Sequence, residues 1–433
     1  MMDGGVYAAR GFSSVRYRVV AFTVALAGVT YLDRVCISIL APVIMADLGL
    51  TMDQMSYVFS AFTFAYAIFE MPTAWWADRI GSRKVLTRIV VWWSAFTMLT
   101  AAAWNYAAML AIRFLFGVGE AGAWPNAWRV FSRWIPATER GRVQGVFFAG
   151  AHLAGGLTPA VVAWIALQLP WRAVFVLFGF VGLAWAAAWY RWFRDEPREH
   201  ASVSPEERDY IEASRGIAPG HTGGSWSAVF TTPGLLALCI QYFANTYGFY
   251  FFITWLPTYL TNARGMQSAE LAIFAGLPLT LSAIADVTGG MTTDALARRL
   301  GIKNGYRLVG GVAYLLGAAI MLAGALTPQA RLAGILIAVA GALSMFTLAP
   351  SWSTAIGLGG PNAGLMGAVM NSSGQIGGIL SPIVLSRLVG RFHDWSLPLI
   401  VLSGLYLIAS LCWLFIQPER GNSGPTASKP RPS

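Results

Sequence analysis

Charged side chains are scarce in this sequence. Asp, Glu, Lys and Arg together make up 12% of the 433 residues, and 56% of the residues are hydrophobic. Soluble domains usually carry about 25% charged residues, so the composition excludes an ordinary soluble protein and is typical of a membrane protein. Aromatic residues are abundant, with 18 Trp, 25 Phe and 15 Tyr, as expected where aromatic rings line the two membrane interfaces.

Cysteine is also rare. The three cysteines, Cys36, Cys239 and Cys412, all fall within apolar segments, and no pair of them has the spacing of a metal or redox site. The ordinary interpretation is that they are small buried residues. We therefore expect neither a metal nor a cofactor.

The sequence lacks the short motifs of several functional classes. It contains no GxxxxGK(S/T) phosphate-binding loop, so ATP is not expected to drive the protein. It contains no HExxH, CxxC or GxSxG pattern, so we expect no enzyme activity. No nucleic-acid-binding motif is present, and the net charge of +10 comes from basic residues in short loops between apolar runs.

Long hydrophobic runs are what the sequence has in abundance. A membrane-spanning helix needs about 20 mostly apolar residues, and twelve such segments predict an all-α membrane protein with twelve transmembrane helices in two six-helix bundles. The first six segments are Tyr17–Ala41, Gln54–Ala77, Val85–Trp104, Ala107–Phe131, Gly141–Leu167 and Trp171–Phe193. The second six are Pro233–Asn262, Ser268–Asp294, Tyr306–Ala325, Arg331–Ile356, Asn362–Val389 and Trp395–Ile416.

Polar stretches set the predicted domain boundaries. Residues 1–193 form the N-terminal bundle, residues 194–232 a cytoplasmic linker, residues 233–416 the C-terminal bundle, and residues 417–433 a cytoplasmic tail that we expect to be disordered. This layout of six spans, a loop and six spans is typical of transporters. The first apolar run is too long for a signal-peptide core, so we expect it to be retained as a span.

A weak internal repeat and the loop charges support this layout. Asp78 is followed by Arg79 and Arg83 at the end of the second segment, and Asp294 is followed by basic residues such as Arg298 at the end of the eighth. Most of the 30 Lys and Arg residues would lie on one side of the membrane. The positive-inside rule therefore predicts that both termini are cytoplasmic.

Four charged residues lie inside predicted spans: Asp33 and Arg34 in the first, and Arg113 and Glu120 in the fourth. Arg113 and Glu120 are nearly two helical turns apart, so both leave from the same helix face. The nearby glycines at 117, 119 and 122 would let a ligand or another helix approach closely. Exposing all four charges to lipid would cost on the order of 10 kcal/mol, so they must face one another or a water-filled cavity.

Two interpretations of these four residues remain open. They could be a structural cluster in which two carboxylates neutralise two guanidiniums, or they could belong to an ion or substrate path. In the second case, the planar guanidinium would bind an anionic substrate bidentately. Asp33 or Glu120 would compete for the same arginine and would release it when protonated. This competition predicts proton–anion coupling.

Other polar residues inside the spans are weaker candidates. Glu70 and Asp286 could line a cavity or cap an arginine. His152 could titrate near neutral pH, or it could be a hydrogen-bonded structural histidine. Asn371 lies on a segment rich in small residues, where a ligand contact and helix packing are both open. Four aromatic residues could line a cavity for a hydroxylated ligand, or they could only pack against other helices: Tyr66, Tyr247, Tyr250 and Trp352.

At these residues the chain resembles the major facilitator superfamily. Residues 76–83, Trp-Ala-Asp-Arg-Ile-Gly-Ser-Arg, resemble the loop signature between its second and third helices, with Ala74 in place of the usual leading glycine. Over nearly the whole chain, the sequence more specifically resembles the anion:cation symporter family. The stretches that carry this likeness are Tyr31-Leu32-Asp33-Arg34, Arg113 with Gly117-Val118-Gly119-Glu120-Ala121 and Pro125, Trp134-Ile135-Pro136 with Glu139-Arg140, Thr254-Trp255-Leu256-Pro257-Thr258-Tyr259-Leu260, and Asn371 with Gly374, Gly377-Gly378 and Pro382.

The resemblance implies proton-coupled import of a small organic anion, such as a sugar acid or another carboxylate, across the bacterial inner membrane. It implies that Arg34 binds the substrate carboxylate, that Asp33 and Glu120 carry protons, and that Arg113 sets their charge. It further implies that Asn371, Trp352 and Tyr66 contact the substrate. We add Tyr250 and His152 to the expected substrate-binding residues from their positions in the spans. Two positions depart from the family pattern, because Glu70 stands where a glutamine is expected and Ala151-His152 stands where sugar-acid carriers tend to have a glutamine.

The expected mechanism is alternating access, in which two bundles rock about a site at the bilayer midplane. The conformational gate would involve Asp78, Arg79, Arg83 and Asp294 in the cytoplasmic loops. Partners would be protons, the small anion and the lipid bilayer, without nucleic acid, and the protein would act as a monomer. Three alternatives remain: an exporter of another small molecule, a non-transporting anion receptor, and a membrane-embedded enzyme. A receptor would need a larger output domain than residues 194–232 offer.

Overall fold

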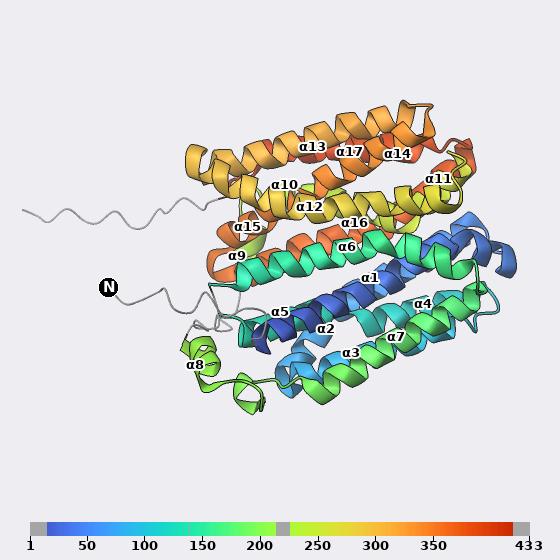
Figure 1. Ribbon diagram of the computed structural model, residues 1–433. Helices are drawn as coiled ribbons and strands as arrows, with labels where there is room; N and C mark the ends of the chain where they lie inside the picture. Colours follow the sequence, from blue (N-terminus) through green and yellow to red (C-terminus); the bar gives the residue numbers. More distant parts are fainter. Residues whose placement is uncertain (1–14, 137, 214–225, 419–433) are drawn as a thin grey trace, which may run out of the picture.

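The computed structural model describes residues 15–136, 138–213 and 226–418, and within these residues it contains helices and no β-strand. The predicted all-α fold is confirmed. Two groups of long helices lie side by side (Figure 1). We call residues 15–193 the first half and residues 233–418 the second half. The first half contains α1 (Val15–Leu48), α2 (Met52–Ile80), α3 (Ser82–Thr100), α4 (Tyr106–Glu120), α5 (Ala123–Trp134), α6 (Arg140–Ala166) and α7 (Trp171–Trp192).

The second half repeats this arrangement of long helices. A short 3-10 turn (Pro197–Glu199) and two short helices, α8 (Pro205–Ala213) and α9 (Trp226–Phe230), lie between the halves in sequence. The second half contains α10 (Leu235–Thr254), α11 (Leu256–Asn262), α12 (Ser268–Leu300), α13 (Ile302–Leu326), α14 (Ala330–Met345), α15 (Leu348–Gly359), α16 (Ala363–Phe392) and α17 (Ser396–Phe415).

Three of the twelve predicted segments are each broken into two helices, which corrects the expectation of continuous spans. The fourth segment breaks after Glu120, because Gly122 adopts a left-handed conformation with φ 89°. The seventh breaks at Trp255, just before Pro257, and the tenth breaks between Met345 and Leu348, just before Pro350. A proline near a helix start is tolerated because its missing N–H group would have no partner there.

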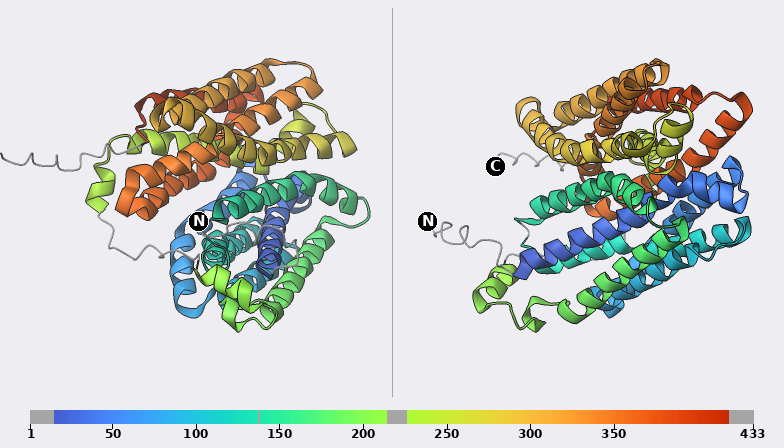
Figure 2. Two further views of the ribbon diagram at one scale, coloured as in Figure 1. Left: turned by 60° about the vertical axis from the view of Figure 1, so that its left-hand side comes forward. Right: turned by 45° about the vertical axis from the view of Figure 1, so that its right-hand side comes forward.

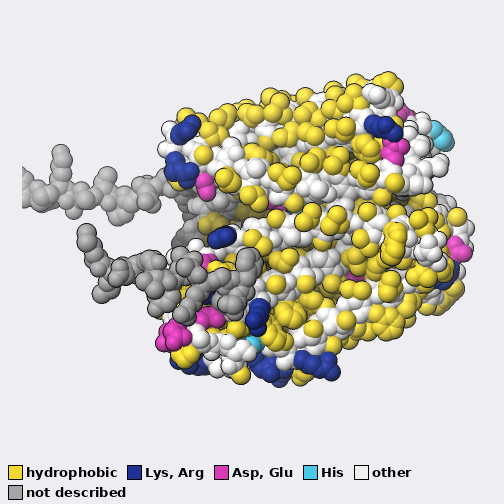
Figure 3. All heavy atoms as spheres, in the orientation of Figure 1, with side chains coloured by type: hydrophobic (Ala, Val, Ile, Leu, Met, Phe, Trp, Pro, Cys, Tyr) yellow, Lys and Arg dark blue, Asp and Glu magenta, His cyan; other side chains and the backbone are white. Residues whose placement is uncertain are grey.

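The surface pattern fits a membrane environment. Nine helical segments of the described chain are long and apolar enough to cross a membrane, counting α4 with α5 and α14 with α15 as single segments. Hydrophobic side chains cover the broad middle of the molecule, whereas Lys, Arg, Asp and Glu gather toward its two ends (Figure 3). This apolar belt between charged ends is the surface that a bilayer requires.

The two ends of the molecule differ in what they carry. Helix α8 lies at the end where α1 begins, and we call this the linker end (Figure 1). The connection between α1 and α2 lies at the opposite end, which we call the far end, and the right-hand view in Figure 2 shows the same arrangement. The long helices run between these two ends, so a residue near the middle of a long helix lies near the middle of the apolar belt.

The halves meet mainly along two helix pairs, α6 with α12 and α2 with α16, which together we call the seam; α1 also touches α10 and α11. The α6–α12 contact is close enough that a Cβ atom on Gly276 would lie 2.0 Å from the Gly156 carbonyl oxygen. Across the other pair, the Ser60 hydroxyl donates to the Ile379 carbonyl oxygen at 2.8 Å. Small residues permit this close helix approach, as in many membrane proteins.

Further seam contacts lie toward the far end. The Ser386 hydroxyl donates to the Ser56 hydroxyl oxygen at 3.0 Å, and the Arg387 guanidinium donates to the Tyr57 hydroxyl oxygen at 2.9 Å. These contacts join the first turns of α2 to the last turns of α16. The halves are therefore held together at the far end in this structure.

Candidate anion-binding site

Helix α4 positions two of the four predicted intramembrane charges. The helix begins after Asn105, whose side chain accepts a hydrogen bond from the Ala108 N–H group at 2.9 Å, as a capping residue does. Arg113 and Glu120 lie on this helix, and both are buried, with 3% and 0% of their surface exposed. Gly117 lets α4 approach α2, since a Cβ atom there would lie 2.5 Å from the Phe62 carbonyl oxygen.

An ion pair joins α4 to α1. The Arg34 Nε group donates to Glu120 Oε1, and only 8% of the Arg34 side chain and 1% of the Glu120 side chain are exposed. Glu120 is the last residue of α4, where the break before α5 ends the helix. The pair thus fixes the end of α4 against the middle of α1. A hydrogen bond between two charged groups is one of the stronger polar contacts in a protein interior.

Aromatic rings enclose both guanidiniums. The Arg34 Cζ atom lies 5.1 Å from the ring centre of Phe62 and 5.0 Å from that of Tyr66. The Arg113 Cζ atom lies 5.6 Å from the same Phe62 ring and 4.2 Å from the Phe116 ring. Ring faces attract cations more strongly when water is excluded. The two positive charges are therefore stabilised without consuming their hydrogen-bond donors.

Asp33 completes the charged centre, which we define as Asp33, Arg34, Arg113 and Glu120. Asp33 is 1% exposed and lies within electrostatic range of Arg113 and Glu120. Several buried atoms of the centre have no hydrogen-bond partner among the described residues: both Asp33 carboxylate oxygens, Arg34 Nη2, Arg113 Nε and Glu120 Oε2. Buried polar atoms are usually paired. The centre therefore retains donors that suit an anion and acceptors that suit a proton.

The second half reaches this centre through α10 and α16. Tyr250 is buried, lies against Gly378 of α16 and is within electrostatic range of Arg34. The Asn371 side chain donates to Glu70 Oε2 at 3.2 Å, which links α16 to α2. Glu70 is itself within electrostatic range of Arg34. Residues from both halves thus face the same region of the seam.

Trp352 lies at the edge of this region. Its ring meets the Tyr242 ring edge-on, with centroids 5.9 Å apart, and 37% of the residue is exposed. Tyr242 lies within electrostatic range of Glu70. Trp352 is therefore connected to the charged centre through Tyr242 and Glu70.

His152 has a partner that its sequence position did not reveal. Its Nδ1 atom lies 2.6 Å from Asp286 Oδ2, across the α6–α12 part of the seam. Its ring also meets the Tyr31 ring edge-on at 5.8 Å. Tyr31 precedes Asp33 and Arg34 on α1, so His152 lies beside the centre and is bonded to the second half.

The residues predicted to form a gate lie away from the centre. Arg83 donates to the Tyr190 carbonyl oxygen at 2.6 and 2.9 Å, and its backbone N–H group donates to the Asp195 carboxylate at 3.0 Å. These partners all belong to the first half or the segment that follows it. Arg79 and Asp294 are exposed, and the side chain of Asp78 lies outside the described part of the structure.

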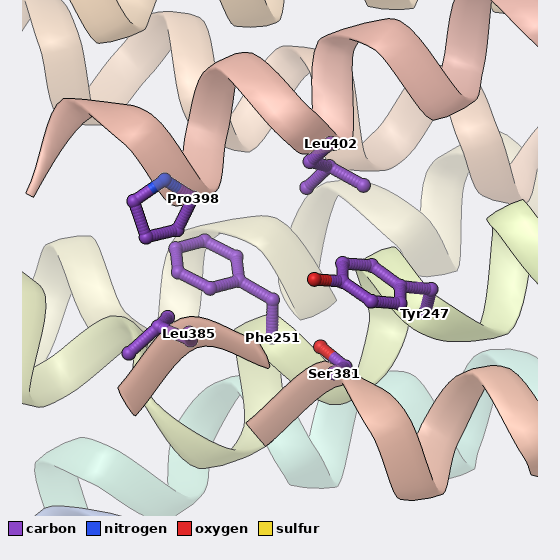
Figure 4. Close-up of a pocket in the computed structure, with 6 residues that line it drawn as sticks. All are labelled: Tyr247, Phe251, Ser381, Leu385, Pro398 and Leu402. Carbon is purple, nitrogen blue, oxygen red and sulfur yellow. The ribbon is translucent and has the colours of Figure 1, made fainter. Parts of the chain in front are cut away.

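A small pocket lies within the second half, between α10, α16 and α17 (Figure 4). Its lining includes Tyr247, one of the predicted cavity aromatics. The lining is otherwise mostly apolar and contains no charged residue: Phe251, Ser381, Leu385, Pro398 and Leu402. None of these lining residues belongs to the charged centre.

Sequence reasoning overlooked Phe62, whose ring contacts both guanidiniums. The spacing of Phe62 and Tyr66, four residues apart on α2, could have suggested a shared aromatic face. No group of three His, Cys, Asp or Glu side chains within the described residues is arranged to hold a metal ion.

Comparison with known proteins agrees with this picture. The sequence model of the Major Facilitator Superfamily matches residues 23–382. The chain is 34% identical over 400 residues to a probable sulfoacetate transporter of Cupriavidus necator, covering 90% of this chain and 91% of that protein. It is 30% identical over 426 residues to a probable galactarate/D-glucarate transporter of Bacillus subtilis, covering 93% and 92%. It is 28% identical over 431 residues to a hexuronate transporter of Bacillus subtilis, covering 96% and 99%.

A solved structure shares the fold. The chain resembles a bacterial homologue of the human lysosomal transporter Spinster, solved in an inward-facing and unoccupied conformation, with a TM-score of 0.74. The likeness covers 93% of this chain and 98% of that chain at 18% sequence identity. It extends over both halves and establishes the architecture.

Proposed function

Because the chain belongs to the major facilitator superfamily, we propose that it is a proton-coupled symporter that imports a small organic anion by alternating access. Membership in this family makes the chain a multi-pass membrane transport protein and not an enzyme. The observation that carries the proposal is the buried Arg34–Glu120 ion pair, which is enclosed by aromatic rings and faces the seam between the halves.

The substrate class follows from the charged centre and from the relatives. Arg34 and Arg113 provide guanidinium forks that match a carboxylate or a sulfonate. The relatives' names state sulfoacetate, galactarate, glucarate and hexuronate as substrates, and each of these is an organic anion. A sugar acid or another small carboxylate therefore suits the site best. Tyr66, Tyr250, Asn371 and Trp352 would provide polar and aromatic contacts to the rest of the substrate.

Proton coupling follows from competition within the centre. The Glu120 carboxylate occupies a donor of Arg34 in this structure. Protonation of Glu120 removes its negative charge and frees that donor for the substrate. Asp33, on the same helix as Arg34, would take part in the same exchange through Arg113. Substrate and proton would then bind together, which is the requirement for symport.

The conformational cycle follows from the seam. The contacts of α2 with α16 hold the far end closed. The positive-inside distribution of Lys and Arg supports a cytoplasmic linker end, and in this orientation the closed far end would face the outside of the bacterial inner membrane. Asp78, Arg79, Arg83 and Asp294 lie at the cytoplasmic ends of their helices and would close that side in the opposite state. We propose that a monomer carries out the whole cycle.

Two measurements test this proposal. Thermal-shift screening of the purified protein should detect stabilisation by sulfoacetate, galactarate, glucarate or glucuronate, because a ligand that binds the folded state raises its stability by mass action. The stabilisation should be lost in Arg34→Ala. In proteoliposomes, an inward proton gradient should drive accumulation of the same anion, and Asp33→Asn or Glu120→Gln should abolish it. Accumulation that persists in both variants would overturn the proposal.

A further inference from the structure

The α6–α12 part of the seam contains a buried acid–base pair. The Nδ1 atom of His152 lies 2.6 Å from Oδ2 of Asp286, and only 4% and 9% of the two side chains are exposed. The rings of Tyr31 and Phe249 flank the imidazole, with centroids 5.8 and 6.1 Å away. The pair is therefore shielded from solvent and joins one half of the molecule to the other.

The backbone beside the pair makes its geometry sensitive to movement of the halves. One turn along α6 from His152, a Cβ atom on Gly156 would lie 2.2 Å from the Thr280 hydroxyl oxygen of α12. The helices thus touch almost backbone to backbone next to the pair. Separation of α6 from α12 would lengthen the His152–Asp286 contact, because these two side chains bridge the two helices directly.

The pair has two protonation states that differ in net charge. With one shared proton, imidazolium and carboxylate neutralise each other and form a charge-assisted hydrogen bond. Without that proton, the buried pair carries a net negative charge, and Asp286 Oδ1 already has no hydrogen-bond partner among the described residues. Burial of an uncompensated charge is costly. Loss of the proton should therefore favour separation of the helices and entry of water.

We propose that His152 and Asp286 form a second proton-binding site, separate from Asp33 and Glu120, which holds the seam closed when it is protonated. The proton lies between Nδ1 and Oδ2 in the closed state and passes to water when the seam opens. This inference rests on the alternating-access part of the proposed function and is independent of which anion is carried.

The surroundings of the pair support a separate site. Arg34, which is within electrostatic range of Tyr31, is already paired with Glu120. Helix α15 carries no ionisable side chain, and Arg331 lies in the first turn of α14, at the far end. The Tyr31 ring meets the imidazole directly, and Tyr31 is itself within electrostatic range of Arg34, Glu120 and Asp286. The other ionisable groups on α6, on α12 and on the helices packed against them are Arg140 and Arg142 of α6, Glu270, Asp294, Arg298 and Arg299 of α12, Arg16, Tyr17, Arg18, Asp33, Arg34, Cys36 and Asp47 of α1, Arg129 and Arg133 of α5, Arg172, Tyr190 and Arg191 of α7, Cys239, Tyr242, Tyr247 and Tyr250 of α10, Tyr259 of α11, and Lys303, Tyr306, Arg307 and Tyr314 of α13.

Distance measurements across the seam test the inference directly. Gln168 and Ala269 are exposed and lie at the far ends of α6 and α12. Spin labels at these positions, in a chain whose three cysteines are replaced by alanine, report opening in lipid nanodiscs without any substrate. The closed population should grow as the pH falls from about 8.5 to about 5.5, by at most about tenfold per pH unit for one linked proton.

Three variants separate a proton site from a structural contact. His152→Asn with Asp286→Asn keeps polar side chains at both positions but cannot titrate, so the pH dependence should disappear. Asp286→Asn alone is a milder change that leaves a titratable imidazole without its carboxylate partner, so the midpoint of the pH dependence should move to lower pH. Glu270→Gln removes a carboxylate from an ion pair with Arg331 at the exposed end of α12 and should leave the pH dependence intact.

A measurement on the unmodified protein complements the variants. The chain contains four histidines, so the His152 ring signal in a nitrogen-15 spectrum can be assigned by its loss in His152→Asn. This signal should titrate with the same midpoint as the distance change. A pH-independent distance, a double variant with unchanged pH dependence, or a His152 midpoint that differs from the distance midpoint would each overturn the inference. Failure of anion uptake with an intact seam response would overturn only the proposed function.

Discussion

Replacement of Glu120 by glutamine isolates the competition on which symport depends. The substitution keeps the size of the side chain but removes the negative charge that faces Arg34. Because 1% of the Glu120 side chain is exposed, solvent cannot screen the contact. A hydrogen bond to a charged group contributes about 1.5–3 kcal/mol. Removal of this competitor should strengthen anion binding at alkaline pH by about tenfold to about a hundredfold.

The same substitution should lower the stability of the protein without ligand. Arg34 would lose its charged partner, and breaking a buried ion pair from one side costs about 3–5 kcal/mol. A bound anion would replace the missing charge, so the ligand should raise the melting temperature more in Glu120→Gln than in the unchanged protein. Binding should also become less dependent on pH, because one of the titrating carboxylates is gone.

Isothermal titration calorimetry of the purified protein with sulfoacetate, galactarate and glucuronate, at about pH 6 and about pH 8, measures these effects. Glu270→Gln is the matched control, because it removes the same charge from an exposed ion pair with Arg331 and should change neither the affinity nor its pH dependence. Equal affinities and equal pH dependence of Glu120→Gln and the unchanged protein would refute the competition between Glu120 and substrate for Arg34.

Three further outcomes are expected. Arg34→Lys keeps the charge but loses the planar fork that binds a carboxylate bidentately, so anion affinity should fall by about tenfold or more, as calorimetry would show. Gly276→Ala would place a Cβ atom 2.0 Å from the Gly156 carbonyl oxygen, and overpacking of this kind costs about 1–3 kcal/mol. The spin-label distance between positions 168 and 269 should therefore increase. An unchanged distance would contradict the packing argument. Burial and the Arg194 charge lower the pKa of His200, which lies outside the membrane between Trp134 and Trp192. This contribution to stability is present above the ordinary histidine pKa of about 6.5 and is lost as the pH falls through the lowered value. Hydrogen-exchange protection factors around residues 197–203, which are corrected for the intrinsic pH dependence of amide exchange, should therefore fall in acid in the unchanged protein and not in His200→Gln.

Much of this architecture can be predicted from the sequence, because a membrane imposes long apolar helices. The charges inside those helices are equally conspicuous. Arg113 and Glu120 share a helix face because of their spacing. Because exposing their charges to lipid is costly, they were expected to face polar partners such as Arg34. The structure brings these residues together with Asp33. Whether they bind an anion and protons stays a prediction.

The helix breaks and the seam contacts were less accessible to sequence reasoning. The break after Glu120 depends on the left-handed conformation of Gly122, and a glycine inside an apolar run is compatible with a continuous helix as well as with a break. The pairing of His152 with Asp286 joins residues 134 positions apart. Each side chain alone has several plausible partners, and only the packing of α6 on α12 selects one.

The bare crossing of Gly156 and Gly276 has a mechanical consequence. Because the two glycines bring main-chain atoms into contact, with the Thr280 hydroxyl beside Gly156, few side chains at this point would have to change rotamer before the helices move against each other. Such a crossing can act as a pivot about which the two halves rotate through small angles at a low energetic cost. The rate of turnover would then depend on the polar contacts across the seam, such as His152–Asp286 and the α2–α16 hydrogen bonds. A single methyl group added at the glycine crossing would hinder the rotation.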